Sequence, residues 1–201
     1  AASLRPYQRQ DRKAQQLWTL IKRRATVVKT QQQLRQSLAA TKVPARALFN
    51  QFDQLLKRIE RRIVELVQAL GWTASFGHCR SIPGIGPVNA AALVAACHRG
   101  AFANAHAFVA FLGLDIRLKD SGKFEGQRKL TKCGEAELRR LLYCAAQASR
   151  RHERFQRYYQ HQLDKGRSKI AANVALARKL ARIAFSLMHN QQSFKIATAE
   201  A

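Results

Sequence analysis

The sequence predicts an all-α protein, in which an antiparallel helical-hairpin or coiled-coil arm precedes a compact helical domain. Apolar residues recur at helical spacing through most of the chain, and alternating runs of Val, Ile or Thr are missing outside one loop. Hydrophobic residues make up 47% of the 201 residues, which is typical of a globular chain despite the large charge. We therefore expect an arm at 1–72, a domain at 73–190 and a tail at 191–201.

The arm is predicted from two apolar stripes. The first helix runs from about Arg12 to Ala40, and Arg24 and Gln31 occupy two positions of its apolar seam. Pro44 can serve as the first residue of a second helix, and Gly71 is placed to end it. The stripes fit an antiparallel hairpin, arms that pair with another subunit, or two ordinary core helices.

The domain is expected to contain short helices around a tight turn between Ser75 and Leu112. Two long helices should follow, at 135–162 and 168–188, with Ser168 as an N-cap. The stretch 113–134 has no helical period and forms a short hairpin at most. A structureless loop of this length inside a compact domain is usually functional or disordered.

The charge predicts an anionic macromolecule as partner. The chain has 36 Lys and Arg against 12 Asp and Glu, a net charge of +24, and the excess lies mainly in 1–72 and 141–201. Nucleic acid is the leading candidate, and an anionic membrane surface is the alternative.

With no visible signal peptide and no apolar run that spans a bilayer, we expect a cytoplasmic protein. The four cysteines show no C-x-x-C spacing, so buried or incidental thiols are expected rather than a metal site.

A glycine turn is the strongest local motif. Gly84–Ile85–Gly86 permits a tight turn between helices, and its exposed N–H groups lead into a helix whose positive end attracts anions. The motif resembles the helix-hairpin-helix module, which grips a nucleic-acid phosphate without reading sequence. A plain interhelical turn is the alternative.

A serine in a basic loop is the second candidate site. Ser121 sits in the glycine-bearing loop among cations, and basic residues close to a phosphodiester would stabilise its developing charge and ease deprotonation of a nucleophilic hydroxyl. These cations are Arg117, Lys119, Lys123, Arg128, Lys129, Lys132 and Arg139. From the residues alone, a loop serine such as Ser121 is more often a turn residue than a nucleophile. A third candidate is the pair Tyr158–Tyr159, which follows Arg150–His152 in the sequence. We interpret these residues as a solvated basic helix face with aromatic packing.

Several spaced segments together resemble a known family. They occur in the same order as in the C-terminal transposase domain of the insertion sequence 110 family, bacterial DEDD transposases related to the pilin-gene invertase Piv. The segments are Ile82–Pro87 with Ala90–Leu93, Phe111–Leu114, Ser121–Gly122, Lys132, Gly134, Leu138–Arg140 and Asn173–Phe185. Leu4–Tyr7 and the basic helices after it look like the coiled-coil segment that precedes this domain, so the likeness covers nearly the whole chain.

The resemblance implies a DNA recombinase that moves an insertion element under the guidance of a bridge RNA. In the family an N-terminal RuvC-like domain carries an Asp-Glu-Asp-Asp cluster that binds Mg²⁺, and the C-terminal domain carries a catalytic serine. By motif this serine is Ser121, whose attack on DNA would leave a covalent phosphoserine link. The resemblance also implies a homo-oligomer, because synapsis joins two DNA ends. No cofactor is expected in this chain.

Two departures from the family pattern define the alternatives. The RuvC-like half is not among the 201 residues, so we expect a truncated copy, an excised domain or a fragment that is inactive without that half. The residues Ala95–Arg99 and Gly113–Ile116 also differ from the family pattern, as in a diverged or decaying copy. The alternative function is therefore a non-catalytic nucleic-acid-binding fragment or regulator.

Overall fold

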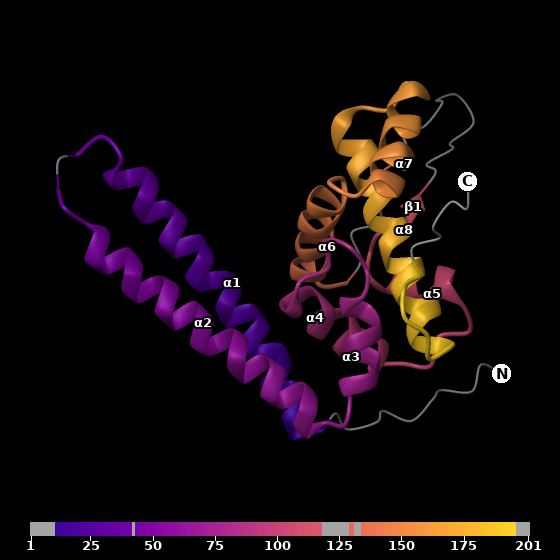
Figure 1. The fold of residues 1–201 in the computed structure, drawn as a ribbon, viewed down its shortest axis with the longest axis horizontal. Helices are drawn as coiled ribbons and strands as arrows, with labels where there is room; N and C mark the ends of the chain where they lie inside the picture. Colours follow the sequence, from indigo (N-terminus) through magenta and orange to yellow (C-terminus); the bar gives the residue numbers. More distant parts are fainter. Residues whose placement is uncertain (1–10, 42, 118–128, 131–133, 196–201) are drawn as a thin grey trace. The chain divides into compact units, whose positions relative to one another are not determined.

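The expected all-α class is confirmed. The computed structural model describes residues 11–41, 43–117, 129–130 and 134–195, with only the backbone described at 116–117 and 129–130. These residues form eight helices and one pair of two-residue strands (Figure 1). They divide into two compact units, one ending at Gly71 and the other beginning at Trp72.

The first unit consists of two long helices, α1 (Arg12–Leu38) and α2 (Arg46–Ala69), which pack against each other. Two polar seam positions of α1 meet acidic residues of α2. Arg24 forms an ion pair with Glu60 at 2.6 Å, and Gln31 Nε2 donates to Asp53 Oδ1 at 2.7 Å. Residue numbers rise along one helix as they fall along the other, so the helices are antiparallel. Matched polar pairs in an apolar seam favour one register over its neighbours.

The ends of these helices follow the sequence in part. Asp11 caps α1, because its carboxylate accepts the N–H of Lys13 at 2.8 Å. Gly71, at φ +71°, ends α2 as expected. The expectation that Pro44 begins the second helix is wrong by two residues, because Ala45 lies outside the helical region at φ −110°, ψ 8°.

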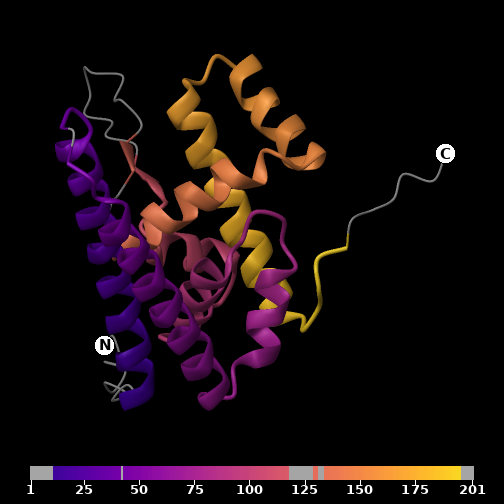
Figure 2. The ribbon, with the colours of Figure 1, turned by 60° about the vertical axis from the view of Figure 1, so that its left-hand side comes forward.

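The second unit is arranged around its last helix. It contains α3 (Thr73–Arg80), α4 (Pro87–Cys97), α5 (Ala105–Phe111), α6 (Ala136–Ser149), α7 (Glu153–Asp164) and α8 (Lys169–His189). α8 contacts each of the five others (Figures 1 and 2). Its fully buried alanines allow the neighbouring helices to approach closely; they are Ala172, Ala177, Ala181 and Ala184. Ser168 caps α8 by accepting the N–H of Ala171, as expected.

The expected single helix at 135–162 is in fact two helices. α6 ends at Ser149, and His152 has extended backbone (φ −94°, ψ 128°) before α7 starts. At this break the Ser149 side chain is held against the α3–α4 turn, with its hydroxyl oxygen 2.7 Å from Pro83 O. The turn lets α7 pack on α8 with Phe155 fully buried. The residues at the break are compatible with a helix, so helical periodicity could not reveal it.

The loop between α5 and α6 begins and ends in a small antiparallel pairing. β1 (Ile116–Arg117) pairs with β2 (Lys129–Leu130), with Ile116 opposite Leu130. The short hairpin allowed by the sequence is therefore present at the base of the loop.

Candidate nucleic-acid interface

The α3–α4 turn is anchored by its apolar residues and exposes Gly84. Ile82 and Ile85 are buried, and the Ile85 N–H donates to Ile82 O at 3.0 Å. Arg80 Nη1 closes the turn by donating to Ile85 O at 3.1 Å. The turn therefore keeps the N–H and C=O of Ile85 and the C=O groups of Ile82 and Pro83 in hydrogen bonds within the protein.

Gly84 is required by its backbone conformation and by its neighbour. Its φ of +89° is one that L side chains rarely adopt, and an added Cβ would lie 2.2 Å from Ser149 Oγ and 2.5 Å from Ser149 N. Ser149 is almost completely buried, and its hydroxyl lies within hydrogen-bond distance of both Pro83 O and Ala145 O. This contact explains the glycine by packing, whereas the sequence suggested only a ligand or a tight turn.

Gly86 has a different environment, although it belongs to the same motif. It is the extended N-cap of α4, and an added Cβ would meet nothing within 4 Å. Pro87 follows at the first helical position and has no N–H, and the Ala90 N–H donates to Gly86 O at 2.9 Å. The open space beside Gly86 therefore adjoins the positive end of α4, where a phosphate is favoured.

The predicted residues of the serine loop are only partly described. Ser121, Lys119, Lys123, Arg128 and Lys132 lie outside the described residues. Arg117 and Lys129 are opposite each other in the β1–β2 pairing, and only their backbone is described.

The ends of the serine loop are held together near α5. Gly134 has φ +91°, and an added Cβ would lie 2.6 Å from Phe111 O. Arg139 Nη1 donates to Gly134 O at 3.0 Å, so this predicted binding residue holds the loop base in the described structure. Arg99 and Glu135 approach each other to 3.7 Å at the same end of α6. These contacts close the loop at its base.

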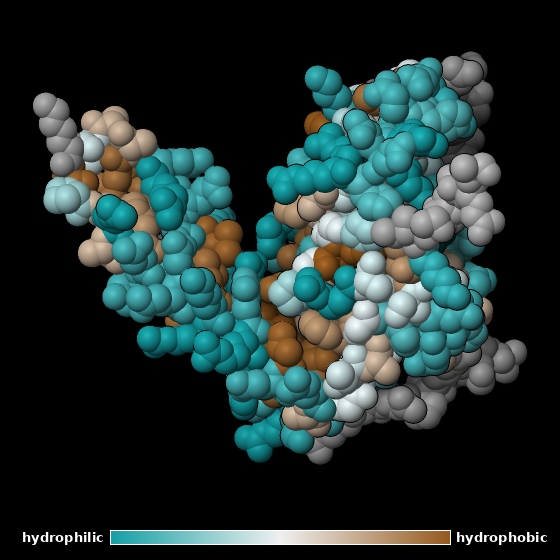
Figure 3. Space-filling view, in the orientation of Figure 1, coloured by the Kyte–Doolittle hydropathy of each residue, from teal (hydrophilic) through white to brown (hydrophobic). Residues whose placement is uncertain are grey.

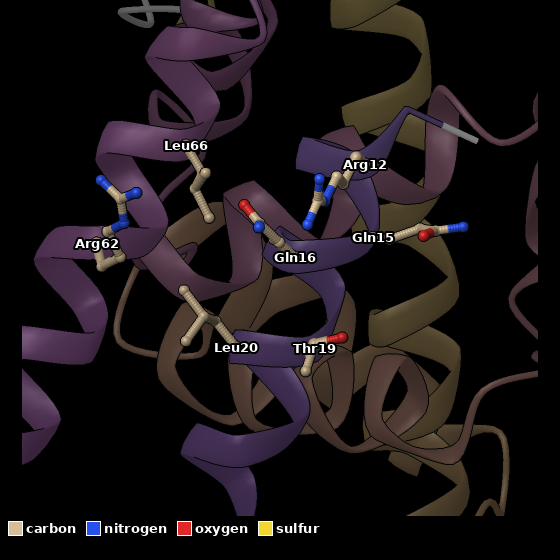
Figure 4. Close-up of a pocket in the computed structure, with 7 residues that line it drawn as sticks. All are labelled: Arg12, Gln15, Gln16, Thr19, Leu20, Arg62 and Leu66. Atoms are coloured by element: carbon tan, nitrogen blue, oxygen red, sulfur yellow. The ribbon is translucent and has the colours of Figure 1, made fainter.

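Cations dominate the surface of the first unit. Figure 3 shows a mostly hydrophilic visible face on α1 and α2, with smaller hydrophobic patches. A groove of about 540 Å³ between the two helices combines apolar side chains, amides and two cations (Figure 4). Its lining residues are Arg12, Gln15, Gln16, Thr19, Leu20, Arg62 and Leu66. One of the four acidic residues of this unit caps α1, and the other three bond to side chains of the same unit. Most of the described Lys and Arg side chains of this unit therefore remain exposed to solvent.

Cys79 and His98 have packing roles in the structure. Cys79 is fully buried, and burial together with nearby Cys97 raises the pKa of its thiol to about 12. His98 stacks on Trp72 at 4.3 Å between ring centroids, and burial lowers its pKa. Across the described ranges, no group of three or more His, Cys, Asp or Glu side chains is placed to hold a metal ion.

Sequence reasoning missed two kinds of residue in this unit. Ser149, the packing partner of Gly84, is distant in the chain and gave no local signal. The sequence placed excess positive charge in 141–201, but it did not indicate the group formed by Arg154, Lys179 and Arg182, although the stretch from 165 to 195 contains seven Lys and Arg and no Asp or Glu. That imbalance is the signal that could have found it.

The comparison with known protein families finds a match for part of the chain. None of the helices in the described ranges is long and apolar enough to cross a membrane. No curated protein matches the chain significantly. Residues 78–160, which include both the glycine turn and the serine loop, match the model of the Transposase IS116/IS110/IS902 family. Residues 78–160 are therefore similar to the transposase domain of that family.

Proposed function

We propose that this chain is the serine-bearing part of a DNA transposase, with Ser121 as its nucleophile. The family match carries the proposal, because it spans both the α3–α4 turn and the loop 113–134. A transposase domain must hold DNA phosphates and present a group that breaks a phosphodiester. The turn supplies the first function and the serine loop the second.

The proposed reaction is a transfer of a DNA phosphoryl group to serine. The Ser121 hydroxyl oxygen forms a bond to phosphorus, and the bond from phosphorus to the deoxyribose oxygen of the leaving strand breaks. The serine proton ends on that leaving hydroxyl, and the phosphoserine link conserves the energy of the broken bond for rejoining. Arg117, Lys119, Lys123, Arg128, Lys129 and Lys132 would stabilise the charge on the non-bridging oxygens.

The closed base of the loop supports this role. The β1–β2 pairing and the close approach of Gly134 to Phe111 O bring together the ends of the loop in which Ser121 lies. Mg²⁺ is expected in the RuvC-like domain. Among the described residues of this chain, no set of side chains is placed to bind it, and the proposed reaction does not use it.

The arm would pair two copies of the chain. Leu48 and Leu55 lie seven residues apart on α2 and are 45% and 44% exposed, which is unusual for large apolar side chains. A second copy could cover this stripe, as synapsis of two DNA ends requires. Replacing both leucines by Gln should shift the protein from dimer to monomer in light scattering.

The decisive experiment is to trap the covalent intermediate. The chain and its Ser121→Ala variant are each mixed with a separately expressed RuvC-like domain, guide RNA and radiolabelled element-end DNA, and then denatured. We expect a protein–DNA band with the wild type and no band with Ser121→Ala. Ser168→Ala is a matched control, because it removes a described serine hydroxyl elsewhere in the same unit, and it should keep the band.

A non-catalytic nucleic-acid-binding function is the second candidate, favoured by the net charge of +24. A chain with that function would bind DNA with a steep salt dependence. Neither the wild type nor Ser168→Ala would then form a covalent adduct.

A further inference from the structure

Three cations on α7 and α8 lie together without an acidic partner. Lys179 and Arg182 are one turn apart on α8, and Arg154 of α7 is close enough to act on Lys179 electrostatically. α8 contains no Asp or Glu. The two acidic residues of α7 are engaged elsewhere on that helix, Glu153 with Arg157 and Asp164 with Gln160. No ion pair of these three cations is found among the described residues.

Aromatic rings hold these cations in place. Lys179 Nζ lies 3.9 Å from the centre of the Tyr158 ring, and the guanidinium of Arg150 lies 4.6 Å from that of Tyr159. Arg154 lies over the ring of Phe194 at 5.7 Å. Because the cations lie over these ring faces, the rings orient charge and are poorly placed for stacking with nucleic-acid bases.

The cost of gathering these charges is visible at Lys179. Burial, and then the charges of Arg154 and Arg182, lower the pKa of this side chain. Clustered like charges destabilise the folded protein unless an anion neutralises them, so the arrangement favours a bound anion.

The cation group adjoins the α3–α4 turn. Arg150 directly follows Ser149, the residue packed against Gly84. The Phe194 ring lies under Arg154, and the backbone N–H of Phe194 donates to Ser81 Oγ at 2.7 Å. A strand whose phosphate sits at the turn can therefore continue over α7 and α8.

We propose that Arg150, Arg154, Lys179 and Arg182 form a second phosphate-binding surface that extends the grip of the α3–α4 turn along the DNA backbone, with Lys179 held over Tyr158 and Arg150 over Tyr159. The surface binds the sugar–phosphate backbone without reading bases. This inference rests on the proposed action on DNA. An anionic membrane is less suited as partner, since the aromatic rings that could insert into lipid lie beneath the cations.

The test measures the salt dependence of binding to a fluorescein-labelled DNA duplex of arbitrary sequence. The cluster variant carries Arg154→Gln, Lys179→Gln and Arg182→Gln. The matched control carries Lys165→Gln, Arg167→Gln and Lys169→Gln, which removes the same charge from exposed positions of the same unit. A conservative variant with Arg154→Lys, Lys179→Arg and Arg182→Lys keeps the charge, and circular dichroism verifies that all variants are folded.

The salt slope decides the outcome. Each lost phosphate contact lowers the slope of log K against log salt by about 0.9, so the cluster variant should lose about 2–3 units of slope. We expect the control to lose less than about one unit and the conservative variant to keep the wild-type slope. Equal losses in cluster and control variants would overturn the inference while leaving serine chemistry untouched. A cluster variant that keeps the wild-type salt slope on DNA but no longer binds phosphatidylserine vesicles would also overturn the inference. Wild-type protein that binds no DNA would overturn this inference and the proposed function together.

Discussion

Replacing Gly84 by Ala should strongly destabilise the second unit. A positive φ costs a non-glycine residue about 1–2 kcal/mol, and forcing a methyl group into a filled space costs about 1–3 kcal/mol more. The atoms that this methyl group would meet include N and Cα of Ser149, at 2.5 and 2.7 Å, which belong to the backbone of α6 and cannot rotate away. We therefore expect a loss of about 2–5 kcal/mol in the free energy of unfolding.

The control comes from the same motif. Gly86→Ala meets open space at φ −78°, so it should change the free energy of unfolding by about 1 kcal/mol or less. Urea denaturation followed by Trp72 fluorescence, in a Trp18→Phe background, reports on the second unit alone, because the chain has two tryptophans. Adding Ser149→Ala to Gly84→Ala should not restore stability, since the backbone contacts remain. Equal urea midpoints for Gly84→Ala and Gly86→Ala would refute the packing argument.

Three further predictions concern other parts of the second unit. Gly134→Ala should lose about 2 kcal/mol or more, because its Cβ would lie 2.6 Å from Phe111 O at positive φ, and limited proteolysis should then cut the loop 113–134 faster. Exposed Cys144 should react with a thiol reagent at mildly alkaline pH while Cys79, buried and with a pKa raised to about 12, stays unmodified in peptide mass spectra; modification of both at equal rates would contradict its burial. A bound phosphate raises the lowered pKa of Lys179 again, so DNA affinity should fall as pH rises through that lowered pKa, and Lys179→Arg should remove this dependence in anisotropy titrations.

Local patterns were enough to predict the two helices of the first unit and the start of α8. The apolar spacing of α1 and α2, the C-terminal glycine at 71 and the cap at Ser168 each depend on residues close in sequence. Arg24 and Gln31 looked like interruptions of an apolar seam. Their partners Glu60 and Asp53 lie on the other helix, so the pairing emerges only once the hairpin register is known.

Contacts between distant residues could not be predicted in this way. At the break between α6 and α7, the Ser149 hydroxyl contacts Pro83 O across 66 positions of sequence. The same contact gives Gly84 a packing role that the turn motif alone did not indicate. The sequence likewise could not show that Lys179 lies near Arg154 and over the ring of Tyr158, because both belong to another helix.

The central claim, serine attack on DNA, is tested most directly by locating the covalent bond. The adduct formed with element-end DNA would be digested with nuclease and protease and its peptides sequenced by mass spectrometry. We predict a nucleotide attached through phosphate to Ser121 and to no other residue. An adduct on Tyr158, Tyr159 or another side chain, or the absence of any adduct in a mixture that completes strand exchange, would contradict the account.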